Sequence, residues 1–308
     1  MRIVYCGSPD FALPPLEALI SDADYQVVGV VSQPDRARGR GGKMLPTPVK
    51  AAAEAAGIPV ITPRRINEPE AVAQIREWAP DVLVVVAFGQ LLKQELLDLP
   101  PLGVVNVHAS LLPKYRGAAP INRVVMEGES KTGVTTMFLD IGMDSGDMII
   151  RDEIEIGPTD DAGVVHDKLA AAGAPLLIKT LQLIAKGEAP RTPQNHDEAT
   201  FAPMLKKEDE LIDWSWPAEK LGCHIRGMSP FPGTYSFYQG KRIKLFAPVV
   251  AAAAGQPGEI LAADDKGLLI ACGEGALLFG EVQPEGKARM AAAAFCRGYA
   301  PKAGTILG

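Results

Sequence analysis

Cysteine is scarce in this chain of 308 residues, and the four cysteines lie far apart. None has the Cys-x-x-Cys spacing that is typical of zinc and redox sites. Neither a metal site nor a disulfide framework is indicated, and a reducing, cytoplasmic compartment is expected. The first residues predict a short strand rather than a signal peptide, and no apolar run is expected to be long enough to span a bilayer. We therefore expect no membrane partner.

Three common site motifs are also missing. The turn at residues 7–10 follows the first predicted strand without a Gly-x-Gly-x-x-Gly pattern, so a dinucleotide cofactor is not expected. No Gly-x-Ser-x-Gly nucleophile elbow is found. The acidic loop 140–147 has Ser145 where a calcium-binding EF-hand needs glycine, and Arg151 stands where it needs glutamate. Calcium binding is therefore not expected.

The net charge of −6 argues mildly against a nucleic-acid partner, but the charge is unevenly distributed. Residues 205–308 sum to +1, so the remainder carries −7. Within that acidic part, residues 33–50 hold five Lys and Arg side chains against Asp35 alone. Such a stretch could contact phosphates or be a solvated flexible loop, and the residues taken alone favour the loop.

Apolar strands and helices alternate from the start of the chain to about residue 187. This alternation predicts an α/β domain over residues 1–189, with a doubly wound and mostly parallel sheet. Residues 190–206 begin with a polar stretch that contains prolines, which predicts a linker. Residues 207–308 contain several short strands separated by glycine-containing turns, which predict a small antiparallel β-barrel.

The segment 104–113 is the most informative part of the chain. Its valines predict a buried strand, and Asn106 and His108 interrupt that strand two residues apart. Both side chains must project from one face, and a buried amide and imidazole cost free energy without partners. Pro113 ends the strand, so the pair lies where open α/β sheets bind ligands. An amide beside an imidazolium would stabilise a carbonyl oxyanion, which favours acyl transfer without a covalent enzyme intermediate.

Three carboxylates follow a later predicted strand, in the loop 140–147. A solvated turn and a catalytic acid loop are about equally supported by these residues alone. The pair Asn106 and His108 favours the second interpretation, because a carboxylate beside an imidazole fixes its charge and orientation.

The pattern Asn106-x-His108-x-Ser110-Leu111-Leu112-Pro113, then Arg116-Gly117-x-x-Pro120 and Asp144-x-Gly146, resembles the folate-dependent formyltransferases. The resemblance covers nearly the whole chain and implies a Rossmann-like catalytic domain followed by an OB-like barrel. It implies catalytic roles for Asn106, His108 and Asp144. It also implies 10-formyltetrahydrofolate as co-substrate without a metal, and a folate site lined by Ser110, Leu111, Leu112 and Pro113.

The basic stretch resembles the loop of those family members that formylate initiator methionyl-tRNA. The resemblance implies that this loop and the barrel contact the tRNA, although the barrel is only weakly basic here. Within the loop, Arg40 aligns with the arginine that enters the acceptor stem. The expected partners are initiator methionyl-tRNA and the folate, and the chain is expected to be a monomer. The expected tRNA-binding residues are Arg36, Arg38, Arg40 and Lys43.

Alternative functions remain at this point. A related enzyme could formylate a UDP-amino sugar, or hydrolyse formyl-folate with water as acceptor; the basic loop argues against both. A folate-binding or RNA-binding module without catalysis is disfavoured by the complete Asn106, His108 and Asp144 set. A glycinamide ribonucleotide formyltransferase is disfavoured because its chain would end near the predicted linker.

Overall fold

The computed structural model describes residues 1–38 and 42–308, which form two compact units. Unit 1 contains Met1–Ala118, Thr132–Ile154 and His166–Ala202. Unit 2 contains Ala119–Lys131, Glu155–Val165 and Pro203–Gly308. The two units are interleaved along the chain, whereas the predicted division assigned one continuous stretch to each domain. The boundaries at 189 and 206 stay a prediction.

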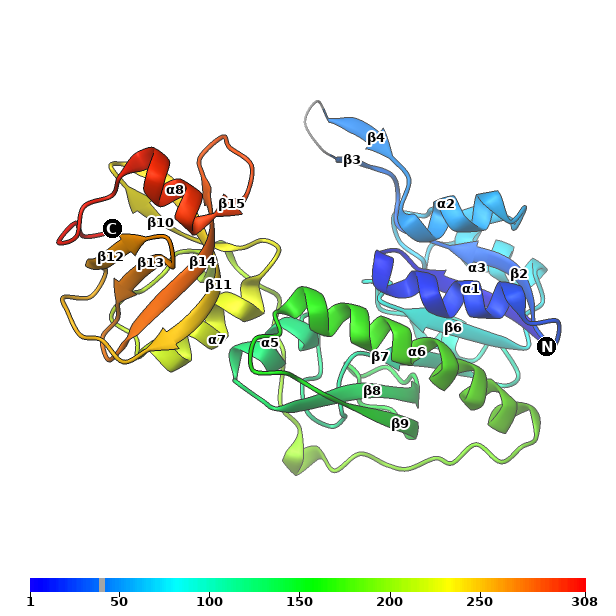
Figure 1. Ribbon diagram of the computed structural model, residues 1–308. Helices are drawn as coiled ribbons and strands as arrows, with labels where there is room; N and C mark the ends of the chain where they lie inside the picture. Colours follow the sequence, from blue (N-terminus) through cyan, green and yellow to red (C-terminus); the bar gives the residue numbers. More distant parts are fainter. Residues whose placement is uncertain (39–41) are drawn as a thin grey trace. The chain divides into compact units, whose positions relative to one another are not determined.

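Unit 1 is built on one seven-stranded sheet (Figure 1). The order of its strands is β5 (Val60–Ile61), β2 (Gln26–Val31), β1 (Arg2–Gly7), β6 (Val82–Val86), β7 (Val104–His108), β8 (Lys131–Phe138) and β9 (Met148–Glu155). The first five strands are parallel, and β8 is antiparallel to β7. The order reverses between β1 and β6, which is the switch point of a doubly wound sheet. The prediction of a mostly parallel α/β sheet is confirmed.

Helices in unit 1 flank this sheet. They are α1 (Leu13–Ser21), α2 (Pro48–Ala55), α3 (Pro69–Glu77), α4 (Gln94–Leu97) and most of α6 (Ala162–Ala185), with short 3-10 turns η1 (Asp10–Ala12) and η2 (His196–Glu198). In α6, Gly173 faces Val107 of β7, and a Cβ at this position would lie 3.4 Å from Cγ1 of Val107, in ordinary van der Waals contact. On the other face of the sheet, Val104 belongs to a buried cluster with Val72 and Ile75 of α3. Because side chains alternate, Asn106 and His108 continue the face that Val104 begins.

Helix α6, with 24 residues, is long and apolar enough to cross a membrane by length and composition, and an 18-residue window of it has a mean hydropathy of 1.3. The sequence did not predict a segment of this kind, because Asp167, Lys168 and Lys179 interrupt its apolar residues. One face of the helix is a core face, where Leu169, Leu177 and Leu181 are fully buried.

Residues 33–50 contain a feature that the sequence did not predict. Strands β3 (Arg36–Arg38) and β4 (Lys43–Leu45) pair in antiparallel fashion, with Arg36 opposite Leu45 and Arg38 opposite Lys43. This β3–β4 hairpin projects from the rest of unit 1 (Figure 1). The expected flexible loop is therefore a two-stranded ribbon at its base, because pairing satisfies backbone groups that a loop would leave to water.

Unit 2 combines an antiparallel sheet with helices. The sheet order is β10 (Thr234–Tyr238), β11 (Lys241–Ala251), β14 (Ala276–Pro284), β13 (Gly267–Ala271) and β12 (Ile260–Asp264), with β15 (Met290–Ala291) paired to β14. Its helices are α5 (Pro120–Met126), η3 (Lys207–Glu210), α7 (Ala218–Met228) and α8 (Ala292–Tyr299). The Asn122 side-chain amide donates to the carbonyl of Gly227 over 2.8 Å, which ties α5 to α7.

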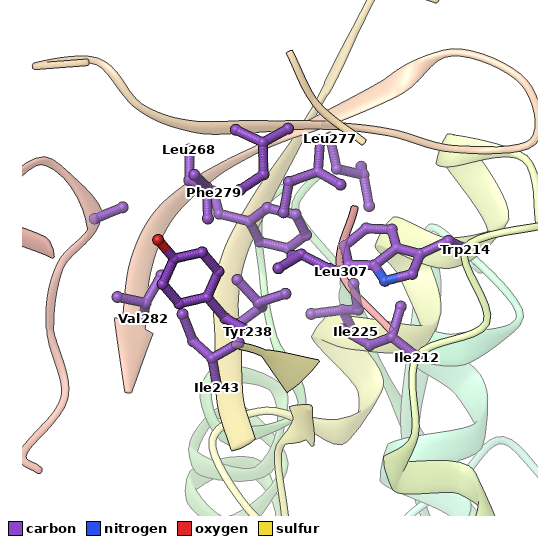
Figure 2. Close-up of a cluster of buried hydrophobic side chains, with 14 of the residues drawn as sticks. Ile212, Trp214, Ile225, Tyr238, Ile243, Leu268, Leu277, Phe279, Val282 and Leu307 are labelled. Carbon is purple, nitrogen blue, oxygen red and sulfur yellow. The ribbon is translucent and has the colours of Figure 1, made fainter. Parts of the chain in front are cut away.

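The last residues of the chain connect the two edge strands of this sheet. Ile306 bridges to Glu259 beside β12, and the Gly308 N–H donates to the carbonyl of Phe237 in β10 over 3.2 Å. The sheet thus curls around one apolar core, in which Trp214 meets Phe279 edge to face (Figure 2). The predicted small antiparallel domain is confirmed.

Candidate active site

The polar pair on β7 lies at the carboxyl end of the strand, as predicted, with His108 as its last residue. Asn106 and His108 are only 8% and 6% exposed. Within the described part of the chain, the Asn106 side chain has no hydrogen-bond partner. A mostly buried amide without a protein partner fits a ligand oxygen that accepts a hydrogen bond, such as the oxygen of a formyl group.

The two ring nitrogens of His108 have different neighbours. Nε2 lies 3.0 Å from the carbonyl oxygen of Tyr115, and Nδ1 lies 3.8 Å from Oδ2 of Asp144. A carbonyl can only accept, so Nε2 carries a proton and donates it to Tyr115. Nδ1 is therefore the nitrogen available for chemistry. It can donate a hydrogen bond only when it also carries a proton.

The acidic loop presents one of its three carboxylates to this histidine. The Asp140 carboxylate accepts from the Gly142 N–H and the Ser145 hydroxyl, which bends the loop. Asp147 lies 3.9 Å from Arg191. Asp144, in a left-handed conformation with φ 50°, instead accepts the Gly117 N–H through Oδ2 over 2.8 Å. The structure thus brings Asn106, His108 and Asp144 together in unit 1, and their catalytic roles stay a prediction.

Glycine is required at position 146 for a local reason. A Cβ on Gly146 would lie 1.9 Å from the carbonyl oxygen of Phe138, well inside van der Waals contact. After Asp144 the chain can therefore pass this close to the end of β8 only if residue 146 has no side chain. This explains the spacing of Asp144 and Gly146 in physical terms.

The predicted linker, residues 190–206, contacts the loop that follows β7. The Arg116 N–H donates to the carbonyl of Thr200, and the Ala202 N–H donates to the carbonyl of Arg116. The Arg116 guanidinium is buried and donates to the Oε1 of Gln194 through Nε and Nη2, over 3.0 and 2.7 Å. Residues 192–202 are therefore fixed on unit 1. Arg116 belonged to the recognised motif, whereas no pattern in the sequence pointed to Gln194.

The expected folate-lining residues differ in what they present. The Ser110 hydroxyl is fully buried and donates to the carbonyl of Lys114 over 2.6 Å. Leu112 is also fully buried, as part of the core. Leu111 and Pro113 are half-buried. If this segment lines a folate, the contacts come from Leu111, Pro113 and the backbone, and the role of the segment stays a prediction.

Three of the expected tRNA-binding residues lie on the β3–β4 hairpin. Arg36 is exposed at the start of β3, Arg38 ends that strand, and Lys43 begins β4. Arg40 lies outside the described residues. The hairpin therefore carries Arg36, Arg38 and Lys43, and its contacts with tRNA stay a prediction.

The base of the hairpin is held by polar contacts. The buried hydroxyls of Ser32 and Thr47 lie 2.5 Å apart, and Lys50 Nζ lies 2.9 Å from both carboxylate oxygens of Asp35. This hydrogen bond to Asp35 raises the pKa of Lys50, and partial burial opposes the rise. The positive charge of Lys50 is therefore paired with Asp35 at the hairpin base, although Lys50 is one of the five basic residues of the stretch 33–50.

Other chemistries find little support near the site. Cys6, near the carboxyl end of β1, is fully buried, and burial raises its pKa to about 12. A thiol in that state is a poor nucleophile at neutral pH. Within residues 1–38 and 42–308, no group of three or more His, Cys, Asp or Glu side chains is arranged to hold a metal ion.

Comparisons with known proteins agree with this geometry. Residues 1–181 match the formyl transferase family and residues 204–300 match its C-terminal domain. The methionyl-tRNA formyltransferase of Geobacter sulfurreducens is 47% identical, with 100% of this chain and 97% of that protein covered. The enzyme of the same name from Desulforamulus reducens is 49% identical, with 100% and 98% covered.

A solved structure shows the same fold at low sequence identity. It is the N-formyltransferase of Helicobacter canadensis, in complex with folinic acid and dTDP-3-aminofucose, with a TM-score of 0.68 and 17% identity. The match covers 92% of this chain and 99% of that one. At this identity the likeness concerns the fold alone, whereas the relatives near 47% identity span the full chain. The chain therefore belongs to the formyl transferase family, among the methionyl-tRNA formyltransferases.

Proposed function

We propose that this protein transfers the formyl group of 10-formyltetrahydrofolate to the α-amino group of methionine on initiator methionyl-tRNA. The observation that carries the proposal is the full-length match to methionyl-tRNA formyltransferases, at 47% identity. The clustering of Asn106, His108 and Asp144 supplies a chemical reason for it. The enzyme is proposed to act in the cytoplasm. It is also proposed to be a monomer, and sedimentation equilibrium can test this oligomeric state.

The folate, when bound, supplies an electrophilic formyl carbon for attack by the amine. The Asn106 amide and the Nδ1–H of His108 then donate to the formyl oxygen as negative charge develops there. Tyr115 holds the ring through Nε2, so the donating nitrogen does not rotate away. Asp144, whose Oδ2 lies 3.8 Å from Nδ1, is the nearby base that can receive a proton from the attacking amine. The bond between the formyl carbon and the folate nitrogen then breaks as that nitrogen takes up a proton, and tetrahydrofolate leaves.

The decisive experiment offers one donor and three acceptors. Purified protein is incubated with formyl-labelled 10-formyltetrahydrofolate and equal concentrations of charged initiator tRNA and a UDP-amino sugar, in water. We expect label on the methionyl-tRNA. Label on the sugar, or release as formate at the same rate without tRNA, would assign the protein to one of the alternative reactions. No turnover with any acceptor would contradict catalysis itself.

Binding of tRNA gives a second, independent measurement. If basic side chains contact phosphates, the affinity for tRNA falls steadily as salt concentration rises. An affinity that does not depend on salt would contradict the role proposed for the hairpin and leave the formyl transfer reaction untouched.

A further inference from the structure

Gln194 uses both ends of its side chain to join two loops. Its Oε1 accepts from Nε and Nη2 of Arg116, over 3.0 and 2.7 Å. Its Nε2 donates to the carbonyl oxygens of Asp144 and Gly146, over 2.9 and 2.8 Å. The side chain is 5% exposed, so these four contacts use its full hydrogen-bonding capacity without water.

The two loops that Gln194 joins are the ones that orient His108 and Asp144. The first loop receives the Nε2–H of His108 at Tyr115 and donates to the Asp144 carboxylate from Gly117. The second loop carries Asp144 itself. The 3.8 Å separation of His108 Nδ1 and Asp144 Oδ2 therefore depends on how the loops are held together.

We propose that Gln194 is a positioning residue, which sets the distance between Asp144 and His108 by joining residues 115–117 to residues 144–146. It touches neither substrate in this proposal and acts through the two loops. The inference deepens the proposed formyl transfer and takes its catalytic meaning from it, but the structural link can be measured without turnover.

The hydrogen bonds of residue 194 require an amide side chain. One end must accept from a guanidinium, and the other must donate to two carbonyls, which a carboxylate cannot do. In Gln194→Glu, the contact with Arg116 becomes an ion pair and is retained. The second carboxylate oxygen then faces the carbonyl oxygens of Asp144 and Gly146, which repel it. This variant separates the two halves of the link without removing the support of the buried Arg116.

The test uses Gln194→Glu in the full chain, with Asn195→Ala as the matched control. Among the residues that the structure describes, the Asn195 side chain bonds only to Asp197 and Glu198. With ¹⁵N-labelled histidine, the four imidazoles give few resonances. We expect the ring resonances of His108 to move in Gln194→Glu while those of His224 stay. We also expect kcat to fall about 10- to 100-fold, as for a misplaced catalytic group, with both KM values retained.

Other outcomes are equally informative. Unchanged His108 resonances together with wild-type kcat in Gln194→Glu would overturn the proposal. If Gln194→Glu does not fold by circular dichroism, Gln194→Asn, one methylene shorter, is measured in the same way and must show the same two changes. If wild-type protein forms no formylmethionyl-tRNA but His108 still responds to position 194, the proposed function fails and the positioning link stands.

Discussion

The His108 site and the β3–β4 hairpin both follow strands of one sheet, β7 and β2, yet they are built in opposite ways. Around His108 the side chains are buried, and His108 and Asp144 each contact a loop backbone. The hairpin is a short ribbon with exposed Arg36, and polar contacts hold it at its base. Covalent chemistry needs fixed geometry, whereas contact with a large polyanion needs reach and charge.

This contrast predicts different kinetic signatures. Changes in the buried cluster should act on kcat, because a partly desolvated donor contributes most in the transition state. Changes in the hairpin should act on KM for tRNA and on its salt dependence, because exposed charges are screened. Kinetics of single variants can therefore test whether catalysis belongs to the His108 site and tRNA binding to the hairpin.

The largest effect is expected from the two donors at the end of β7. Removing one oxyanion donor costs about 10²–10³ in kcat, so Asn106→Ala and His108→Ala should each lose that much. Asn106→Asp should lose at least as much, because a carboxylate would face the developing negative charge. Steady-state kinetics with formyl-folate and charged tRNA measure this, and folate affinity by titration calorimetry should survive.

The control for these variants is a histidine in unit 2. His224 bonds through Nε2 to the carbonyl of Asp209, and His224→Gln should keep wild-type kcat. If His108→Ala and His224→Gln had equal kcat values, the assignment of the site would be wrong.

The next effect concerns the backbone of the acid loop. In Gly146→Ala the new Cβ would meet the carbonyl of Phe138, so the loop must move and carry Asp144 with it. A shift of about 1 Å in a catalytic group can cost about 10²-fold in rate. The matched control is Gly298→Ala in α8, where a Cβ meets nothing within 4 Å. Wild-type kcat in Gly146→Ala would show that the position of Asp144 is not critical.

Much of the fold could be predicted because hydrophobic periodicity decides it. The alternation of apolar strands and helices predicted the mostly parallel sheet, and the valines of residues 104–107 predicted β7. The strand β9 and the helices α3 and α8 were not predicted. In β9 the apolar pattern is broken by exposed charged residues such as Arg151 and Asp152, and in α3 four polar or charged side chains stand among nine residues. Where tertiary contacts select a strand or helix, the hydrophobic pattern of a single sequence does not predict it.

The site was predictable where its residues share one strand, and less so elsewhere. Asn106 and His108 followed from strand alternation, while Asp144 needed the family resemblance. The network of Arg116 and Gln194 was missed, because the two residues lie 78 positions apart and the second is in a polar stretch. Only the folded chain brings a guanidinium to that amide. The β3–β4 pairing was missed for a similar reason, since glycine and arginine give weak strand signals.

A moderate effect is expected from the hairpin. Arg36→Ala combined with Arg38→Ala should raise KM for tRNA about 10-fold at unchanged kcat. It should also lower the slope of log affinity against log salt by about 2, one for each lost phosphate contact. The matched control removes two exposed charges elsewhere in unit 1, Arg151→Ala with Lys186→Ala. A fall in kcat in the hairpin variant would contradict the assignment of tRNA binding alone to the hairpin.

The smallest effect is expected at the hairpin base. Asp35→Ala removes the nearer of two carboxylates beside Lys50, at 2.9 Å against 3.9 Å for Glu54, and a partly exposed ion pair contributes only about 0.5 kcal/mol to the free energy of unfolding. Since Asp35 raises the pKa of Lys50, this contribution is complete below the ordinary lysine value of 10.5 and is lost as pH rises through the higher folded value. The stability difference between Asp35→Ala and wild type should therefore be constant from pH 7 to 9 and shrink above 10.5, by urea titration.

The same variant tests how the hairpin is held, through a double-mutant cycle with Lys50→Met. If the ion pair orients the ribbon, Asp35→Ala and Lys50→Met should raise KM for tRNA by similar small factors, and the double variant should add nothing further. Additive increases would mean that each side chain contacts tRNA by itself. In that case Lys50 would belong to the basic surface after all. A fall in kcat in either variant would show that the hairpin base and the His108 site are coupled, against the separation on which the comparison depends.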